Sequence, residues 1–109
     1  MLRQERTAAP AVLRGAGLEV DLARRRVLRD GREVKLKPRE FDLLAFLAAH
    51  PGHVFDRSVL LARVWGYDYS GDTRTVDVHV RGLREKLGPA PDGGPYVETV
   101  WGVGYRFRE

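Results

Sequence analysis

The sequence of 109 residues predicts one α+β domain, in which β-hairpins precede and follow three helices. Two observations support this prediction. Apolar and polar residues alternate in short segments between residues 18 and 36 and again between 96 and 108, as in half-buried strands. Between these regions the apolar residues recur at helical spacing. A chain of this length can bury one core without disulfides or metals, which favours one domain over two.

The first sixteen residues mix charges, alanine and a proline without a sustained period, so we expect a linker or flexible arm over 1–16 and a folded domain over 17–109. The alternation then begins at Leu18, and the Asp30-Gly31 pair predicts a tight hairpin turn. The run from Arg24 to Arg26 fits either a nucleic-acid patch or solvated turn residues between strands.

Two helices are predicted next. The first begins near Pro38, carries a stripe that includes Phe41 and Leu44, and ends at His50 because Pro-Gly follows. The second covers 57–66, with Asp56 or Ser58 as its N-cap and Gly66 at its end. Its predicted apolar positions are Val59, Leu60, Val64 and Trp65.

The stretch TVDVHVRGLREKLG, residues 75–88, fits a strand by its alternating valines and a helix by its longer spacing. Turn formers frame about fifteen residues, from Asp72 and Thr73 to Gly88 and a proline, and that length favours a helix. A helix over about 73–87 places Val76, Val80, Leu83 and Leu87 on one core stripe. Val78 then lies among arginines on the opposite, exposed face.

An exposed valine flanked by Arg74 and Arg81 suits the major groove of DNA, where valine can contact a thymine methyl and arginine can bind guanine or phosphate. A solvated helix with one stray valine fits the periodicity equally well. The preceding helix and short loop favour the first interpretation, because together with the basic third helix they form a helix-turn-helix, and the C-terminal hairpin over 96–108 completes a winged helix.

Three motifs in order, KPREFDLLAFLAAHPG, VWGYDYSGDTRTVDVHVRGLREKLG and YVETVWGVGYRF, closely resemble the C-terminal DNA-binding domain of OmpR/PhoB-type response regulators. The resemblance covers about residues 17–108. It implies a winged helix-turn-helix with an N-terminal four-stranded antiparallel sheet, three helices and a C-terminal β-hairpin wing. It also implies a transcription factor that binds double-stranded DNA at tandem half-sites, monomeric as an isolated domain and a head-to-tail dimer on DNA.

The resemblance also implies site residues. Groove and nearby phosphate contacts fall on Arg74, Asp77, Val78 and Arg81, and further backbone contacts on Arg57, Trp65, Thr75, Arg84 and Thr99. Core packing is an equally good explanation of Trp65. Two positions depart from the family pattern. Gly82 replaces a basic residue that contacts bases, and Trp101 replaces an arginine that enters the minor groove. A tryptophan can pack on sugar or backbone, so we expect Trp101 to contact DNA there, and Arg106 or Arg108 to supply the missing charge.

The loop Tyr67, Asp68, Tyr69, Ser70, Gly71 and Asp72 resembles the family loop that touches RNA polymerase in some members. Its acidic residues suit a protein partner better than DNA, although tyrosines packed back on the domain would also explain it. The family's receiver domain is absent from the sequence, so we expect an isolated effector domain, excised or natural.

The composition argues against other classes. The chain has no cysteine and a formal net charge of +4, mostly from arginine. Its histidines, His50, His53 and His79, have no carboxylates at metal-site or catalytic spacing, so we expect no enzyme, metal or cofactor. The longest apolar run, Leu43 to Ala49, is far shorter than a bilayer span, so we expect a soluble cytoplasmic protein. A winged helix that binds protein, or DNA without regard to sequence, remains the alternative.

Overall fold

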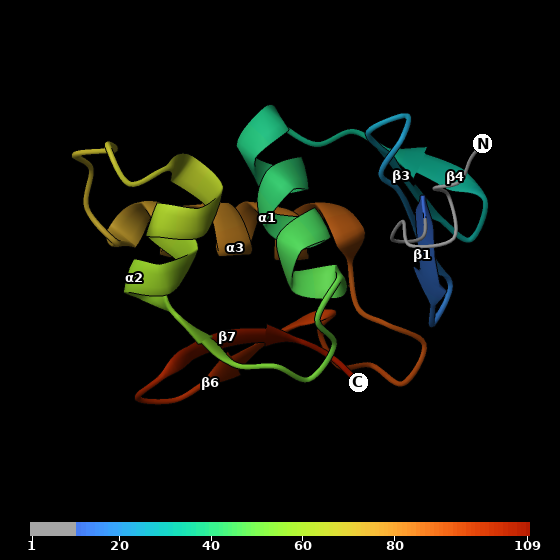
Figure 1. Ribbon diagram of the computed structural model, residues 1–109. Helices are drawn as coiled ribbons and strands as arrows, with labels where there is room; N and C mark the ends of the chain where they lie inside the picture. The colour runs from blue at the N-terminus through green and yellow to red at the C-terminus, as the bar shows by residue number, and fades with distance from the viewer. Residues whose placement is uncertain (1–10) are drawn as a thin grey trace, which may run out of the picture.

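The computed structural model describes residues 11–109. A four-stranded sheet with the order β1-β2-β3-β4 comes first, and the helices α1, α2, η2 and α3 follow (Figure 1). A second sheet, with the order β5-β7-β6, joins the C-terminal hairpin to β5, which lies between α1 and α2 in the chain. The elements of the first half are β1 Val12–Gly15, β2 Leu18–Asp21, β3 Arg26–Arg29, β4 Arg32–Val34 and α1 Pro38–Ala48. Those of the second half are β5 Phe55–Asp56, α2 Arg57–Leu60, η2 Leu61–Trp65, α3 Arg74–Leu87, β6 Val97–Val100 and β7 Gly104–Phe107. The predicted α+β winged helix is therefore confirmed.

The N-terminal sheet is antiparallel throughout, and each strand pairs with the next along the chain. Asp30 and Gly31 have φ angles of 52° and 82°, which fit the mirror-image turn that matches the twist of a two-residue hairpin. The predicted linker over 1–16 is wrong for Val12–Gly15, which form β1. Leu13 of that strand pairs with Val20 and packs on the core, a pattern too short to show as alternation. Residues 1–10 of the predicted linker lie outside the described residues.

The arginine run from 24 to 26 lies in the turn between β2 and β3 and at the start of β3. Arg24 forms an ion pair with Asp21 at 3.2 Å, and Arg25 forms one with Asp42 of α1 at 2.8 Å. The second of the two interpretations, polar turn residues between strands, describes this segment.

The second helix differs from the regular helix that the sequence predicts. Asp56 caps it as expected, because its side chain accepts a hydrogen bond from the Val59 amide. After Leu60 the helix widens into the π-helix η2, and the Gly66 amide donates to the Leu61 and Ala62 carbonyls. The wider turn brings residues five apart onto one side. Leu60, Leu61, Val64 and Trp65 accordingly pack on the core, whereas the predicted core residue Val59 is exposed.

The third helix has the predicted phase. Val76, Val80, Leu83 and Leu87 are buried, and α3 packs against α1. Gly88 ends the helix with a φ of 71°, in the region that glycine favours. Arg29 of β3 donates to the Leu87 carbonyl at 2.6 Å, so the N-terminal sheet closes the C-terminal end of this helix. The alternating valines of this segment are therefore a coincidence of helical spacing.

The C-terminal hairpin of β6 and β7 is extended by the short strand β5, which no alternation in the sequence indicates. Phe55 pairs with Tyr105 and Asp56 with Gly104, so β7 is the central strand. A Cβ at Gly104 would lie 2.1 Å from the Phe55 carbonyl oxygen, which explains a glycine here. The chain just before α2 thus holds the wing against the helices.

Gly82 is partly buried and lies beside Glu40 of α1. A Cβ there would lie 2.3 Å from Glu40 Oε2. Glu40 is buried, and its Oε1 accepts hydrogen bonds from the Lys37 amide at 2.9 Å and from Lys86 Nζ at 2.6 Å. Burial opposes ionisation of Glu40, but these hydrogen bonds hold its pKa below the ordinary value. The glycine leaves room for this packed carboxylate, and the expectation that Gly82 marks a missing DNA contact stays a prediction.

We predict that Leu83→Ala lowers the free energy of unfolding by about 2–5 kcal/mol, because it opens a cavity under the fully buried face of α3. Glu85→Ala on the exposed face of the same helix is the matched control and should change little. Urea unfolding of both variants measures the difference. Equal stability of the two variants would show that the helical phase is wrong.

We predict that Gly82→Ala destabilises the domain, although alanine is favoured over glycine in helices by about 1 kcal/mol. The reason is that the new methyl group displaces the Glu40 carboxylate from its hydrogen bonds. In a Glu40→Ala background the same substitution should stabilise the domain by about 0.5–1 kcal/mol. Thermal unfolding of the four proteins gives this coupling, and equal effects in both backgrounds would contradict it.

Candidate nucleic-acid interface

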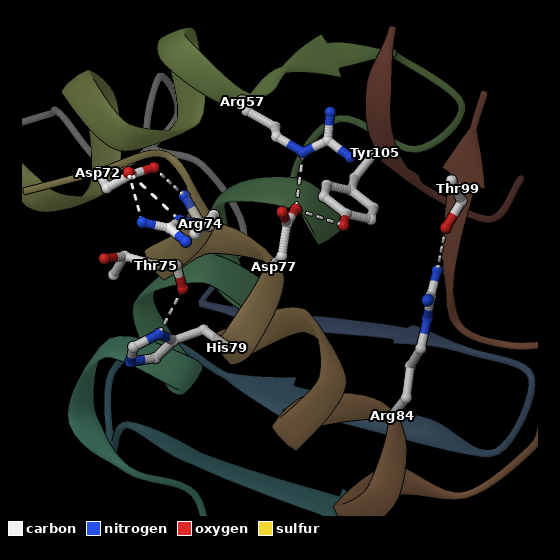
Figure 2. A network of polar contacts seen from close by, with 9 residues as sticks. All are labelled: Arg57, Asp72, Arg74, Thr75, Asp77, His79, Arg84, Thr99 and Tyr105. Carbon is white, nitrogen blue, oxygen red and sulfur yellow. Dashed lines mark hydrogen bonds and ion pairs between the residues drawn. The ribbon is translucent and has the colours of Figure 1, made fainter. Parts of the chain in front are cut away.

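The outer face of α3 is a mixed apolar and basic surface. Val78 is 66% exposed, although the side chains of the opposite stripe are buried. Arg81 lies beside it and reaches Glu85 at 3.6 Å, with both side chains largely exposed. At the start of the helix Arg74 is held by Asp72, which accepts from its Nη2 at 3.2 Å (Figure 2). The face therefore offers an apolar group and two guanidinium groups in weak, exposed ion pairs.

Asp77 does not belong to this free surface. Its Oδ1 accepts hydrogen bonds from Arg57 Nε at 2.7 Å and from the Tyr105 hydroxyl at 2.6 Å (Figure 2). Partial burial opposes ionisation of Asp77, but these two donors hold its pKa below the ordinary value. The guanidinium of Arg57 also lies over the Tyr105 ring, 5.5 Å from its centroid. One carboxylate thus connects α2, α3 and β7.

Arg84 makes a second connection between α3 and the wing. Its Nε donates to the Val97 carbonyl at 3.0 Å, and its Nη2 donates to Thr99 Oγ1 at 2.7 Å (Figure 2). The predicted phosphate contacts Arg84 and Thr99 therefore bind each other. Together with the Asp77 bonds, this pair fixes the hairpin relative to α3 at two points.

Trp65 and His79 pack together on the flank of α3. Their rings lie edge to face with centroids 4.9 Å apart, and Tyr69 approaches Trp65 at 6.4 Å. The Nδ1 atom of His79 lies 2.8 Å from the carbonyl oxygen of Thr75, one turn earlier. His79 is a packing residue, as the sequence indicated. Trp65 is partly buried against the core, which leaves part of its surface exposed beside Thr75 and the start of α3.

The wing has an exposed apolar tip, and its arginines form ion pairs with acidic side chains. Trp101 is 89% exposed in the turn between β6 and β7, and Val103 is also exposed. Arg106 donates to Glu98 across the strands at 2.8 Å. Arg108 binds Asp92 through both terminal nitrogens, a pair that holds the Asp92 pKa well below its usual range. Both arginines are in ion pairs, and their substitution for the charge that the family pattern places at Trp101 stays a prediction.

The two tyrosines of the loop before α3 fit different explanations, one an exposed surface for a protein partner and the other packing against the domain. Tyr67 is 82% exposed and points away from the core, whereas Tyr69 packs near Trp65 and over Gly71. A Cβ at Gly71 would lie 2.1 Å from the Tyr69 ring, so this glycine makes room for the tyrosine. Asp72 is committed to the amide and guanidinium of Arg74. Tyr67, Asp68 and Ser70 remain as exposed residues of the loop.

The structure therefore separates the predicted residues into two groups. Arg74, Val78 and Arg81 share the outer face of α3, while Arg57, Asp77, Arg84 and Thr99 join the elements to one another. Sequence reasoning missed Tyr105 as a member of the second group. Its signal was present, because Tyr105 lies on the inward side of the strand alternation, and a buried hydroxyl requires a partner.

Other kinds of site are not found in the part of the chain that the structure describes. Within residues 11–109 no three His, Asp or Glu side chains lie close enough together to hold a metal ion. Over the same residues, no helix has the length and apolar character needed to cross a bilayer.

Comparisons with known proteins agree with this arrangement. The family model described as "Transcriptional regulatory protein, C terminal" matches residues 31–107. The transcriptional regulatory protein SrrA of Staphylococcus aureus is 47% identical over 108 residues, which are 98% of this chain and 45% of SrrA. The chain thus spans about half the length of the curated relatives it matches.

Solved structures show the same fold. The DNA-binding domain of RstA from Klebsiella pneumoniae, solved in complex with the RstA box, has a TM-score of 0.79 and 34% identity over 91% of this chain and 98% of that domain. The DNA-binding domain of CpxR from E. coli has a TM-score of 0.81 and 33% identity over 93% and 98%. The chain belongs to the family of C-terminal DNA-binding domains of OmpR/PhoB-type transcriptional regulatory proteins.

Proposed function

We propose that this domain binds specific sequences of double-stranded DNA and regulates transcription as the effector domain of a two-component response regulator. The observation that carries the proposal is the outer face of α3, where Val78 is 66% exposed between basic residues while the opposite stripe is buried. An α-helix fits the major groove, in which every base pair presents a distinct pattern of donors, acceptors and methyl groups. The similar DNA-binding domain of RstA, solved in complex with the RstA box, supports the same function.

Within this proposal the two groups of residues have different roles. Val78 contacts a thymine methyl, Arg81 contacts a base edge, and Arg74 contacts a base or a phosphate. Arg57, Thr75 and Trp65 contact backbone phosphates, which the helix dipole favours at the start of α3. Thr75 lies in the first turn of α3, Arg57 binds Asp77 of this helix, and Trp65 packs on His79. Asp77, Arg84 and Thr99 hold the helix and the wing in position. Arg106 supports the hairpin through Glu98.

We also propose the partners that the family resemblance implies. The isolated domain is a monomer in solution and binds tandem half-sites as a head-to-tail dimer. The loop at 67–72 contacts RNA polymerase, a proposal that rests on the exposure of Tyr67 and on its acidic neighbour Asp68. The same proposal places the protein in the cytoplasm, where bacterial DNA lies.

Selection of binding sites from random duplex DNA tests the proposed function directly. A shared sequence motif among the selected sites is expected, and its affinity should exceed that for unrelated DNA at several salt concentrations. A phosphate-only binder would lose affinity steeply and equally on all sequences, by about 0.9 log unit per log unit of salt for each phosphate contacted. Equal affinity for all sequences would contradict the proposal and favour binding without sequence preference.

We predict that Val78→Ala and Arg81→Ala leave the fold intact and relax the preference at particular base pairs. A good bidentate contact contributes about 1–3 kcal/mol of discrimination, and the valine contact should contribute less. Repeating the selection with each variant measures the change. Identical selected motifs for wild type and both variants would show that this face does not contact bases.

We predict that Asp77→Asn weakens binding to all selected sites by a similar factor and does not alter the preferred sequence. The loss of charge weakens the hydrogen bonds to Arg57 and Tyr105, and therefore the placement of α3. Tyr105→Phe is the matched control, because this buried hydroxyl cannot reach DNA and should give the same uniform loss. A changed preference at one base pair with Asp77→Asn alone would instead make Asp77 a base contact.

A further inference from the structure

The excess positive charge of the chain lies on the N-terminal sheet and not on the outer face of α3. Residues 24–39 hold eight of the 19 basic and two of the 15 acidic residues, so the remainder, with eleven basic and thirteen acidic residues, is slightly acidic. This segment forms the turn after β2, the hairpin of β3 and β4 and the start of α1. In Figure 1 the hairpin lies at the opposite end of the molecule from α2 and the start of α3. The proposed DNA-binding face thus leaves the most basic part of the chain without a role.

A small pocket of about 90 Å³ opens on this basic surface. Three of its lining residues are basic, Arg25, Arg26 and Lys35, and one is acidic, Glu33. The other lining side chains are apolar and belong to Val27, Val34, Leu36 and Phe41. A pocket with cations above apolar side chains suits a group that has a carboxylate end and an aliphatic stem, as the side chain of glutamate has.

Arg25 is held in place at this pocket by three contacts with α1. Its Nη1 donates to Asp42 Oδ1 at 2.8 Å, its Nη2 donates to the Pro38 carbonyl at 3.4 Å, and its guanidinium lies 4.6 Å from the centroid of the Phe41 ring. The backbone of Arg25 has a φ of 53°, a left-handed conformation that is unfavourable for a residue with a long side chain. These contacts stabilise that conformation. The guanidinium is therefore positioned before a partner binds, and it loses little freedom on binding.

The two other cations of the pocket are weakly engaged by the domain. The Lys35 side chain is 87% exposed, and its Nζ lies 3.9 Å from Glu33 Oε2, at the limit of an ion pair. Arg26 is exposed, and Asp21, its neighbour across the sheet, is bound to Arg24 at 3.2 Å. Both cations can therefore turn toward an anion in the pocket without the loss of a strong ion pair.

We propose that this surface binds an acidic segment of a partner protein and takes one of its carboxylate side chains into the pocket beside Arg25 and Lys35. A guanidinium binds a carboxylate through parallel hydrogen bonds, and the apolar lining gives the methylene groups of a glutamate a surface to pack on. A protein segment fits this surface better than a nucleic acid. The acidic Glu33 and Asp42 lie beside the cations and repel a continuous row of phosphates, whereas a protein can place its carboxylates between them. The surface lies apart from the outer face of α3, so this interaction is additional to the proposed function.

Titration of the ¹⁵N-labelled protein with hexaglutamate tests this interaction, because the shifts of backbone amide signals locate the bound peptide. The largest shifts are expected at 24–26 and 33–37, and hexaglutamine, the uncharged control peptide, should produce none there. The double variant Arg26→Glu, Lys35→Glu should bind hexaglutamate about tenfold more weakly. The double variant Arg74→Glu, Arg81→Glu has the same net charge and should bind nearly as tightly as wild type. All four side chains are exposed, so both variants should keep the amide spectrum of a folded protein.

Arg25→Lys separates a shaped site from general attraction between opposite charges. The net charge is unchanged, but an ammonium group cannot bind Asp42 and also form two parallel hydrogen bonds with a carboxylate, so binding about threefold weaker is expected. Equal affinity of Arg25→Lys and wild type, or equal losses in the two double variants, would overturn the inference.

An unrelated DNA duplex distinguishes a nucleic-acid surface from a protein surface. It should leave the amides of 24–26 and 33–37 nearly unshifted, and larger shifts there with DNA than with hexaglutamate would overturn the inference. Selection of DNA sites remains a separate measurement, in which the Arg26→Glu, Lys35→Glu variant should select the same motif as wild type. Failure of the proposed function would look different, because wild type would then select no motif at all.

Discussion

The burial of one stripe of α3 determines most of what this domain presents to its surroundings. Val76, Val80, Leu83 and Leu87 contact the core, and no rotation of the helix about its axis could keep all four buried while changing the outer face. The energy of this burial is several times larger than that of any exposed ion pair on the helix. The exposure of Val78 and Arg81 is thus a consequence of packing on the opposite side. A surface suited to base contacts is maintained by residues that never touch DNA.

Hydrogen bonds from α3 to α2 and to the wing fix the orientation of these elements relative to one another. If the helix and the wing contact DNA together, as proposed, their relative position determines whether both contacts form. Asp77 joins α3 to Arg57 and Tyr105, and Arg84 joins it to Val97 and Thr99. These pairs are partly buried, which protects them from solvent screening more than Arg81 and Glu85 are protected. Several residues at family DNA-contact positions therefore also stabilise the interface between the helix and the hairpin.

Most of the fold could be predicted because local signals agreed with the tertiary structure. The Asp30-Gly31 turn, the Pro-Gly stop after α1 and the spacing of α3 each specify one backbone geometry. Three features could not be predicted in this way. Strand β1 is too short to show a period, β5 becomes a strand only through pairing with β7, and the π-helix over Leu61–Trp65 depends on which side chains fit the core. All three are decided by contacts between residues distant in sequence.

In the candidate site too, the helical period predicts which side chains face outward, whereas tertiary contacts decide which partners they bind. Helical phase correctly placed Val78 outside and Val80 inside, since only the backbone period matters for that distinction. It could not show that Asp77 is shared between Arg57 and Tyr105, because those partners come from other elements. Nor could it show that Gly82, near the boundary between the two faces, lies beside Glu40 of α1. A glycine at that boundary costs the helix about 1 kcal/mol against alanine, and the space it leaves admits the Glu40 carboxylate. Glu40 in turn accepts hydrogen bonds from the Lys37 amide at the start of α1 and from Lys86 in the last turn of α3. Gly82 therefore has an explanation within the domain, a buried carboxylate that joins two helices, and the proposed DNA-facing surface of α3 is the one that carries Arg74, Val78 and Arg81.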